Sequence, residues 1–232
     1  MTKTTLNCHV QQIEPLTPFV YRVLLRPEKA LAFIPGQYVC VVMNNGDLRP
    51  FSIASTPEAP ELELHIGATP ENPYAWEVLQ KLKENTTIEI STPQGTAGLT
   101  DSERDILVIA GGTGFSYAWS IIRSHLNSAS SRKVTLFWGA KTLDDLYWHM
   151  QLSELAKKDE RFQYQPVVEQ APENWQGHQG LVHKVALAET ADLTQHDVYI
   201  AGRFEMVRVA RDDFFANKLP ETQLFGDALS YI

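Results

Sequence analysis

The pattern of hydrophobic and polar positions divides the chain into two halves of different period. Up to about residue 98, apolar and polar residues tend to alternate in short runs, as in half-buried β-strands. An Asn-Asn-Gly-Asp turn at 44–47 predicts a hairpin. Strands are predicted over 6–13, 19–25, 37–43, 51–54, 61–66 and 86–90, and a helix over 73–83. Six short strands joined mainly by turns favour a small antiparallel β-barrel.

From residue 104 onward, unbroken apolar runs alternate with amphipathic stretches. The run Ile-Leu-Val-Ile-Ala at 106–110 is typical of a parallel strand buried on both faces. Further strands are predicted over 134–138, 165–169, 198–201 and 223–225, with helices over 115–126, 143–157, 181–189 and 204–217. The predicted fold class is therefore a two-domain β + α/β protein. Residues 1–98 are predicted to form a six-stranded antiparallel β-barrel, and residues 99–232 an open parallel sheet with flanking crossover helices.

Composition and charge narrow the range of partners. The formal net charge is −8, which disfavours binding to nucleic acid. Cys8 and Cys40 belong to no CxxC pair and are expected to be small buried or half-buried residues. The histidines show no metal-binding spacing, so no metal is expected. No secretory signal and no membrane-spanning run is present in this sequence, and we expect a cytoplasmic protein.

Two glycine-containing segments follow predicted parallel strands. The first is Gly111-Gly112-Thr113-Gly114, directly before a helix, and the second surrounds Gly202. Ligands of open α/β sheets bind at the carboxyl ends of strands, where helix N-termini attract phosphate. The first segment is neither a GxGxxG nor a Walker A motif, and either segment taken alone could be a plain turn.

A third motif, Arg49-Pro50-Phe51-Ser52, lies at the start of a predicted barrel strand. Pro50 restricts the backbone of Arg49 to an extended conformation, and alternation sends Phe51 and Ser52 to opposite faces. The motif thus offers an apolar contact and a hydroxyl donor. An ordinary strand with exposed polar residues is the alternative interpretation.

Taken in order, four segments resemble the ferredoxin-NADP reductase superfamily. They are RPFSIAS at 49–55, IAGGTGFSY at 109–117, YIAGRFEM at 199–206 and FGDALSYI at 225–232. The chain looks most like the bacterial NAD(P)H-flavin reductases of similar length, and the resemblance extends over essentially all of it. It implies an NAD(P)H-dependent flavin oxidoreductase, with flavin bound by the barrel and the nicotinamide nucleotide by the Rossmann-like domain.

The resemblance also implies residue roles. Ser52 is the expected catalytic residue, because its hydroxyl would hydrogen-bond flavin N5, the hydride acceptor. The expected flavin-binding residues are Arg49, Pro50, Phe51, Ser52, His65, Gly67, Thr113 and Tyr117. The expected nicotinamide-nucleotide-binding residues are Gly111, Gly112, Thr113, Gly114, Lys141, Gly202, Arg203, Phe204 and Met206. The alternation of 61–66 places His65 on the solvent side of its strand.

The sequence departs from the family pattern at two places. Ala201 and Arg203 stand where the family has Cys and Pro, so a role for that Cys in placing the nicotinamide does not carry over. Residues 71–75 lack the Gly and Ser of the helix start that holds the FAD pyrophosphate in FAD-retaining members. We therefore expect riboflavin, FMN or FAD to be a loosely bound, diffusing substrate. Lys141 could meet a 2′-phosphate, so both NADH and NADPH are expected as hydride donors.

Two other functions remain open on these residues. One is an electron-transfer reductase that holds FAD and serves a protein acceptor; the other is a nucleotide-sensing module without turnover. Oxidation of NADH with free flavin would separate them. For the flavin reductase, a monomer is expected, with reduced-flavin-using enzymes or ferric chelates as downstream recipients.

Overall fold

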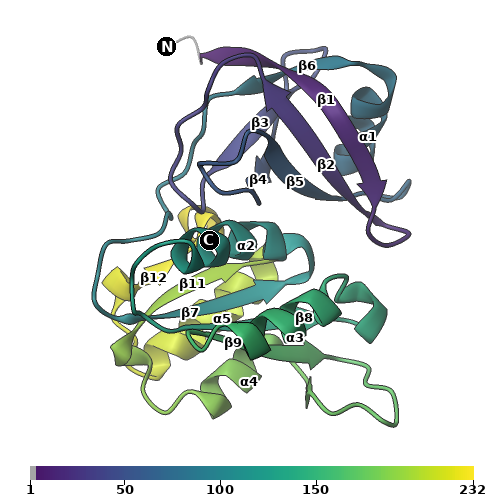
Figure 1. The fold of residues 1–232 in the computed structure, drawn as a ribbon. Coiled ribbons are helices and arrows are strands. Elements are labelled where there is room, and N and C mark those ends of the chain that lie inside the picture. Colours follow the sequence, from purple (N-terminus) through teal and green to yellow (C-terminus); the bar gives the residue numbers. More distant parts are fainter. Residues whose placement is uncertain (1–3) are drawn as a thin grey trace. The chain divides into compact units, whose positions relative to one another are not determined.

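The computed structural model describes residues 4–232, and the chain divides into two compact units. The first comprises the chain up to Leu99 together with Trp119–Ser124, and the second comprises Thr100–Ala118 and His125–Ile232. We call them the β unit and the α/β unit. Figure 1 follows their elements in chain order by colour. Among the described residues, no helix is long and apolar enough to cross a membrane.

The β unit is built on one antiparallel sheet, which confirms the predicted architecture. Its strands are β1 (Thr5–Pro15), β2 (Val20–Pro27), β3 (Tyr38–Val42), β4 (Leu48–Ser52), β5 (Leu62–Gly67) and β6 (Thr87–Ser91). They are ordered β4-β3-β6-β1-β2-β5. The two outer strands approach each other beyond the end of β4, where the N–H of Ala54 donates to the carbonyl of Glu63 in β5 at 2.7 Å. Helix α1 (Pro73–Glu84) packs one apolar stripe into this core, formed by Ala75, Val78, Leu79 and Leu82.

The predicted hairpin at 44–47 connects β3 to β4. The Met43 N–H donates to the Asp47 carbonyl at 2.8 Å, and Gly46 has a φ of 80°. Strand β4 begins earlier than the predicted 51–54, so Arg49 and Pro50 lie inside the strand rather than before it. Pro50 is tolerated there because β4 is an outer strand of the sheet. On the side of β4 that has no neighbouring strand, the missing N–H of Pro50 removes no hydrogen bond between strands.

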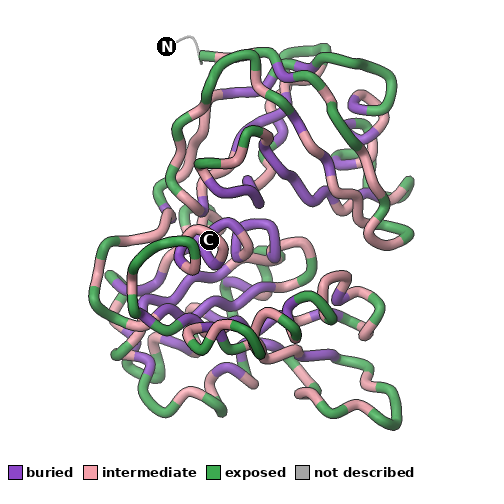
Figure 2. The backbone as a smooth tube through the Cα atoms, in the orientation of Figure 1, coloured by how far each residue is buried: buried purple, intermediate pink, exposed green. Residues whose placement is uncertain are grey.

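The α/β unit contains a parallel sheet, as predicted. Its strands are β7 (Asp105–Gly111), β8 (Val134–Ala140), β9 (Phe162–Val168), β10 (His178–Gln179), β11 (His196–Ala201) and β12 (Leu224–Phe225), in the order β10-β9-β8-β7-β11-β12. Leu107 and Ile109 of β7 pack in a cluster with residues of α4 (Val182–Glu189) and α5 (Phe204–Ala216). Ile106, Val108 and Ala110 point to the opposite face and are equally buried. Both faces of the sheet are therefore covered, as Figure 2 shows by the buried strands.

The remaining helices are α2 (Phe115–Leu126) and α3 (His149–Lys158), and short 3-10 turns cover 112–114, 143–145, 193–195, 221–223 and 227–231. The predicted helix 143–157 is wrong in its first turns. Thr142 and Asp145 cap each other in a short 3-10 turn. The backbone of Leu146 then departs from helical geometry, and the Leu146 side chain is buried. The apolar side chains of this stretch fill the core from a loop, and α3 begins only at His149.

Both cysteines are buried, as the sequence analysis predicted. Cys8 lies on β1 and its side chain packs in the core of the β unit with no exposed surface. Burial, aided by the nearby Glu28 carboxylate, raises the pKa of the Cys8 thiol to about 12. The Cys8 sulfur is therefore a protonated thiol at neutral pH.

Candidate functional site

The two glycine segments lie against each other at the carboxyl edge of the parallel sheet. A Cβ on Gly114 would lie 2.4 Å from the Ala201 carbonyl oxygen, and one on Gly111 would lie 2.6 Å from the Met206 sulfur. A Cβ on Gly202 would lie 2.7 Å from the Met206 methyl carbon. At Gly114 the obstacle is backbone, so a larger residue there would push the segments apart, whereas at Gly111 and Gly202 the flexible end of the Met206 side chain would have to move. The structure thus brings together four residues predicted to bind the nicotinamide nucleotide.

The first segment is a 3-10 turn over 112–114, between β7 and α2. Gly112 has a φ of 52°, which disfavours any residue with a side chain, and Thr113 is half-buried beside it. Strand pairing places Gly111 opposite Gly139 of β8. Lys141 follows two residues later and is exposed, so it lies at the same edge of the sheet, one strand further along.

Arg203 and Phe204 begin α5 at the second segment. Arg203 is the exposed N-cap residue of the helix, and the Phe204 side chain is 51% exposed. Its ring centroid lies 6.0 Å from that of Tyr231, which is 71% exposed. By contrast, Tyr117 has almost no exposed surface, and burial raises its pKa well above the usual range. Its predicted contact with flavin stays a prediction.

Sequence reasoning missed one residue of this region, Trp138. Its indole Nε1–H donates to the Gly112 carbonyl at 3.0 Å. In the sequence, Trp138 ends the mainly apolar run 134–138 and looks like one more core residue, so only its polar N–H distinguishes it.

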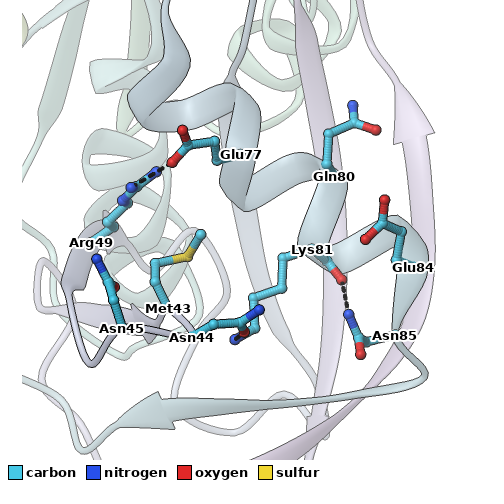
Figure 3. A pocket seen from close by; sticks show the side chains of 9 residues that line it. All are labelled: Met43, Asn44, Asn45, Arg49, Glu77, Gln80, Lys81, Glu84 and Asn85. Atoms are coloured by element: carbon cyan, nitrogen blue, oxygen red, sulfur yellow. Dashed lines mark hydrogen bonds and ion pairs between the residues drawn. The ribbon is translucent and has the colours of Figure 1, made fainter.

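The Arg49 side chain of the β unit is held by three partners, of which Figure 3 shows Glu77. Its guanidinium donates to the Asp47 carboxylate at 2.9 Å, to the Tyr74 carbonyl at 2.5 Å and to the Glu77 carboxylate at 2.7 Å. It also lies 4.8 Å from the centroid of the Tyr74 ring. Arg49 is 8% exposed, and two carboxylates neutralise it. The side chain therefore ties β4 to the first turns of α1.

The rest of this motif is more open. Pro50 is exposed, whereas Phe51 and Ser52 are half-buried at the end of β4. Ser52 is paired with Tyr38 in the sheet. Within residues 4–232, the Ser52 hydroxyl makes no hydrogen bond to another side chain or to the backbone. It can therefore donate to, or accept from, a bound molecule.

The prediction that His65 faces solvent is wrong. Its side chain is fully buried, and Nε2 lies 2.9 Å from a carboxylate oxygen of Glu63 on the same face of β5. Arg22 of β2 donates twice to this carboxylate, at 3.0 and 3.3 Å, and Arg123 of α2 lies 3.5 Å away. The polar face of the strand is covered by ion pairs rather than by water. Gly67 ends the same strand and is half-buried, and the flavin contacts of His65 and Gly67 stay predictions.

The Glu63 carboxylate is expected to make folding sensitive to acid. Burial opposes its ionisation, but hydrogen bonds from His65 and Arg22 outweigh burial and lower its pKa from 4.5 to about 2. Because the folded-state pKa is depressed, the stabilisation is complete above pH 4.5 and disappears as the pH falls toward 2. Between pH 5 and 3 the wild type should lose about 2 kcal/mol more stability than Glu63→Gln. Urea unfolding across this range measures the difference, and parallel pH profiles would contradict the prediction.

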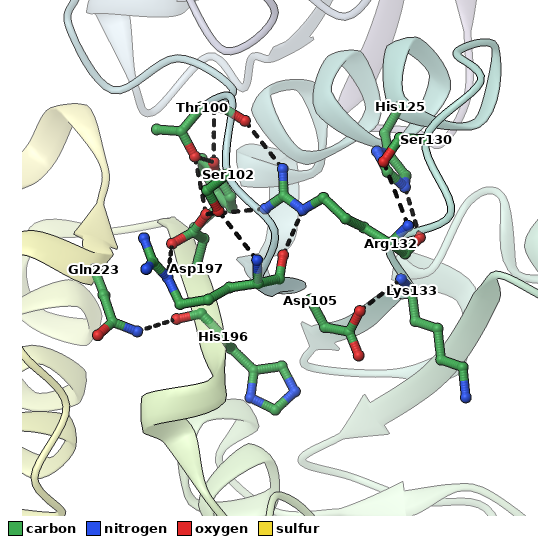
Figure 4. Close-up of polar contacts among 12 residues, drawn as sticks. Thr100, Ser102, Asp105, His125, Ser130, Arg132, Lys133, His196, Asp197 and Gln223 are labelled. Atoms are coloured by element: carbon green, nitrogen blue, oxygen red, sulfur yellow. Dashed lines mark hydrogen bonds and ion pairs between the residues drawn. The ribbon is translucent and has the colours of Figure 1, made fainter.

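A second buried carboxylate, Asp197, lies at the amino-terminal end of β11. It is fully buried and accepts hydrogen bonds from Thr100, Ser102, Arg104 and Arg132 (Figure 4). The Arg104 and Arg132 nitrogens lie 2.7 and 2.9 Å from its oxygens. Burial opposes its ionisation, but the bonds from Ser102, Arg104 and Thr100 hold the pKa below its usual range. The network fixes residues 100–104, which lead into β7, at the sheet edge opposite the glycine segments.

An antiparallel sheet is followed by a parallel sheet with two glycine segments at its carboxyl edge, which is the arrangement of the ferredoxin-reductase-like fold. Residues 108–212 match the oxidoreductase NAD-binding domain family. The fold is similar to that of the ferredoxin reductase in carbazole 1,9a-dioxygenase, with a TM-score of 0.84 at 24% identity, over 98% of this chain and 70% of that one.

Whole-length relatives identify the family. The chain is 43% identical to an NAD(P)H-flavin reductase of Vibrio harveyi, over 98% of this chain and all of the relative (100%). It is also 43% identical to an NAD(P)H-flavin reductase of Aliivibrio fischeri, over 98% of this chain and 99% of the relative. The chain belongs to the NAD(P)H-flavin reductase family. In the described part of the chain, no group of three or more His, Cys, Asp or Glu residues could hold a metal ion.

Proposed function

We propose that the protein is a flavin reductase that uses NADH or NADPH to reduce free riboflavin, FMN or FAD and then releases the reduced flavin. The carrying observation is the 43% identity to flavin reductases over their whole length. The close approach of the glycine segments and the available Ser52 hydroxyl agree with this function. An electron-transfer reductase with a protein acceptor is not favoured by these relatives.

The reaction moves a hydride, two electrons and a proton, from C4 of the reduced nicotinamide to N5 of the oxidised flavin. The negative charge that arrives on the flavin ring is neutralised by a proton from solvent. The two substrates supply this chemistry, and the protein contributes binding and orientation. Ser52 would hold N5 by a hydrogen bond that strengthens as charge develops on the ring. Phe51 and Pro50 would give the ring its apolar contacts.

We assign flavin binding to residues 1–98 and nucleotide binding to residues 99–232. The NAD-binding family match over 108–212 lies within the second segment and supports its assignment. There, the space beside Gly112 is open, so a nucleotide would approach the backbone closely at this residue. Lys141, exposed at the same edge of the sheet, would accept the additional phosphate of NADPH.

Loose flavin binding is supported by the start of α1. Its N-cap residue, Asn72, makes no side-chain capping bond, and Pro73 in the first turn has no N–H to offer. The nearby Arg49 is already neutralised by Asp47 and Glu77. A pyrophosphate at this place would therefore gain few hydrogen bonds and would meet two carboxylates. The ring and ribityl chain, shared by all three flavins, would carry the binding.

The test is oxidation of NADH or NADPH by the isolated chain, followed by absorbance, with and without free riboflavin. We expect rapid oxidation that requires added riboflavin, since riboflavin carries no phosphate. The chain purified without added flavin should be colourless, because a diffusing substrate is lost on gel filtration.

Three outcomes would each contradict a part of the proposal. A yellow protein with stoichiometric flavin would refute loose binding while leaving reductase activity intact. Oxidation that depends on an added protein acceptor, rather than on free flavin, would support the electron-transfer alternative. No oxidation with any acceptor would support the nucleotide-sensing alternative.

A further inference from the structure

Trp138 links the aromatic core of the α/β unit to the first glycine segment. The residue is fully buried on β8, where it pairs with Ala110 of β7. Its ring stacks on Phe115 with centroids 4.1 Å apart and an angle of 16°, and Tyr147 meets it edge-on at 4.9 Å. These contacts fix the indole ring, so its Nε1–H points in one direction. That N–H donates to the Gly112 carbonyl at 3.0 Å.

Gly112 is the glycine of the 111–114 segment that has a positive φ. Its φ of 52° requires glycine, and glycine populates many other conformations equally well. Its carbonyl is nevertheless held from two sides, by the Trp138 indole and by the backbone N–H of Phe115. Gly112 has no side chain that could restrict its backbone, so the hydrogen bond from Trp138 supplies this restriction.

The orientation of this carbonyl also fixes a donor. The Gly112 carbonyl and the Thr113 N–H belong to one planar trans peptide unit, so they point in opposite directions. With the carbonyl turned toward the Trp138 ring, the Thr113 N–H is turned away from the aromatic core. If this peptide flipped, a carbonyl oxygen would take the place of the N–H and would repel a phosphate or a carboxamide oxygen.

We propose that Trp138 is a positioning residue for the nicotinamide nucleotide, which acts by holding the Gly112–Thr113 peptide with its N–H available to the ligand. The inference rests on the proposed function, because it takes the segment at 111–114 as the nucleotide site. Trp138 does not touch the nucleotide itself. Its loss should therefore weaken nucleotide binding, whereas the flavin contacts expected of residues 49–52 in the β unit should stay unchanged.

The first test is Trp138→Phe, which keeps an aromatic ring against Phe115 but removes the N–H donor. We expect the KM for NADH to rise about fivefold to tenfold, the equivalent of one lost hydrogen bond. The KM for riboflavin and kcat should stay within about twofold, because uniform ground-state binding affects KM alone. Equilibrium titration with NADH should give the same change in Kd.

Trp175→Phe is the matched control. The Trp175 indole also donates to a backbone carbonyl of the same unit, that of His178, at 2.9 Å. Removing this second bond costs a similar amount of local stability at the β10 end of the sheet. We expect it to leave both KM values unchanged. A rise in the KM for NADH in both variants would show general loosening of the unit and overturn the proposal.

A second variant covers the case in which the smaller phenylalanine ring disturbs folding. Benzothienylalanine at position 138 keeps the bicyclic shape of tryptophan and replaces the N–H with sulfur. An unchanged KM and Kd for NADH in this variant would overturn the inference, whatever happens to its melting temperature. The proposed function would fail separately, through absence of flavin-dependent NADH oxidation in the wild type.

Discussion

Asp197→Ala should lower the free energy of unfolding by about 3–5 kcal/mol, the cost of breaking a buried ion pair by removing one partner. The carboxylate is fully buried, and Arg132 beside it is only 8% exposed. Without Asp197, the Arg132 charge would remain buried next to an empty space, since within residues 4–232 the remaining acceptors of its guanidinium are the carbonyls of Thr100 and Arg104. Urea unfolding at neutral pH measures the loss.

Asp101→Ala is the control for this prediction. Asp101 lies in the same polar segment but is exposed, so its removal should change stability by less than about 0.5 kcal/mol. A loss below about 1 kcal/mol for Asp197→Ala would show that water enters the site and solvates Arg132. In that case the network would behave like a surface ion pair rather than a buried one.

Ser52→Ala should lower kcat for riboflavin reduction about tenfold or more, the cost of losing a hydrogen bond to the charge that develops on the flavin. The side chain is half-buried at the end of β4 and its hydroxyl makes no hydrogen bond within residues 4–232, so the melting temperature should stay the same. Steady-state oxidation of NADH with saturating riboflavin is the measurement.

Ser52→Thr separates the hydroxyl from the rest of the side chain. It keeps the donor and adds a methyl group, so it should recover part of the lost kcat while the alanine variant does not. Wild-type turnover in Ser52→Ala would remove the hydroxyl from the mechanism. Equal losses in both variants would indicate a packing effect instead of a hydrogen bond.

Local patterns predicted the fold because most elements are defined by their own residues. The continuous apolar run at 106–110 indicated a strand covered on both faces, and the structure places it near the middle of the parallel sheet. The helix predicted over 143–157 is wrong in its first turns, because hydrophobic periodicity gives no information about a capping interaction that favours a different turn. Thr142 and Asp145 satisfy each other's polar groups in a short turn, and this interaction depends on geometry rather than on hydrophobic spacing.

The site was less predictable where its contacts come from distant segments. Alternation placed His65 on a polar face correctly, but it gave no indication that Arg22 and Arg123 would cover that face through Glu63. In the same way, Arg49 in the motif looks free to bind a ligand, and only the fold shows Asp47 and Glu77 occupying it. Charged side chains choose partners by tertiary proximity, which a single sequence does not encode in any local pattern.

The burial of Cys8 has a consequence for the proposed release of reduced flavin. Oxygen converts such a product back to its oxidised form and yields hydrogen peroxide close to its source. Peroxide attacks thiolates, whereas a thiol whose pKa is raised to about 12 and which has no exposed surface resists this attack. The second sulfhydryl, Cys40, is also sheltered from solvent. Burial of both thiols thereby protects the protein from the hydrogen peroxide that follows from its proposed reaction.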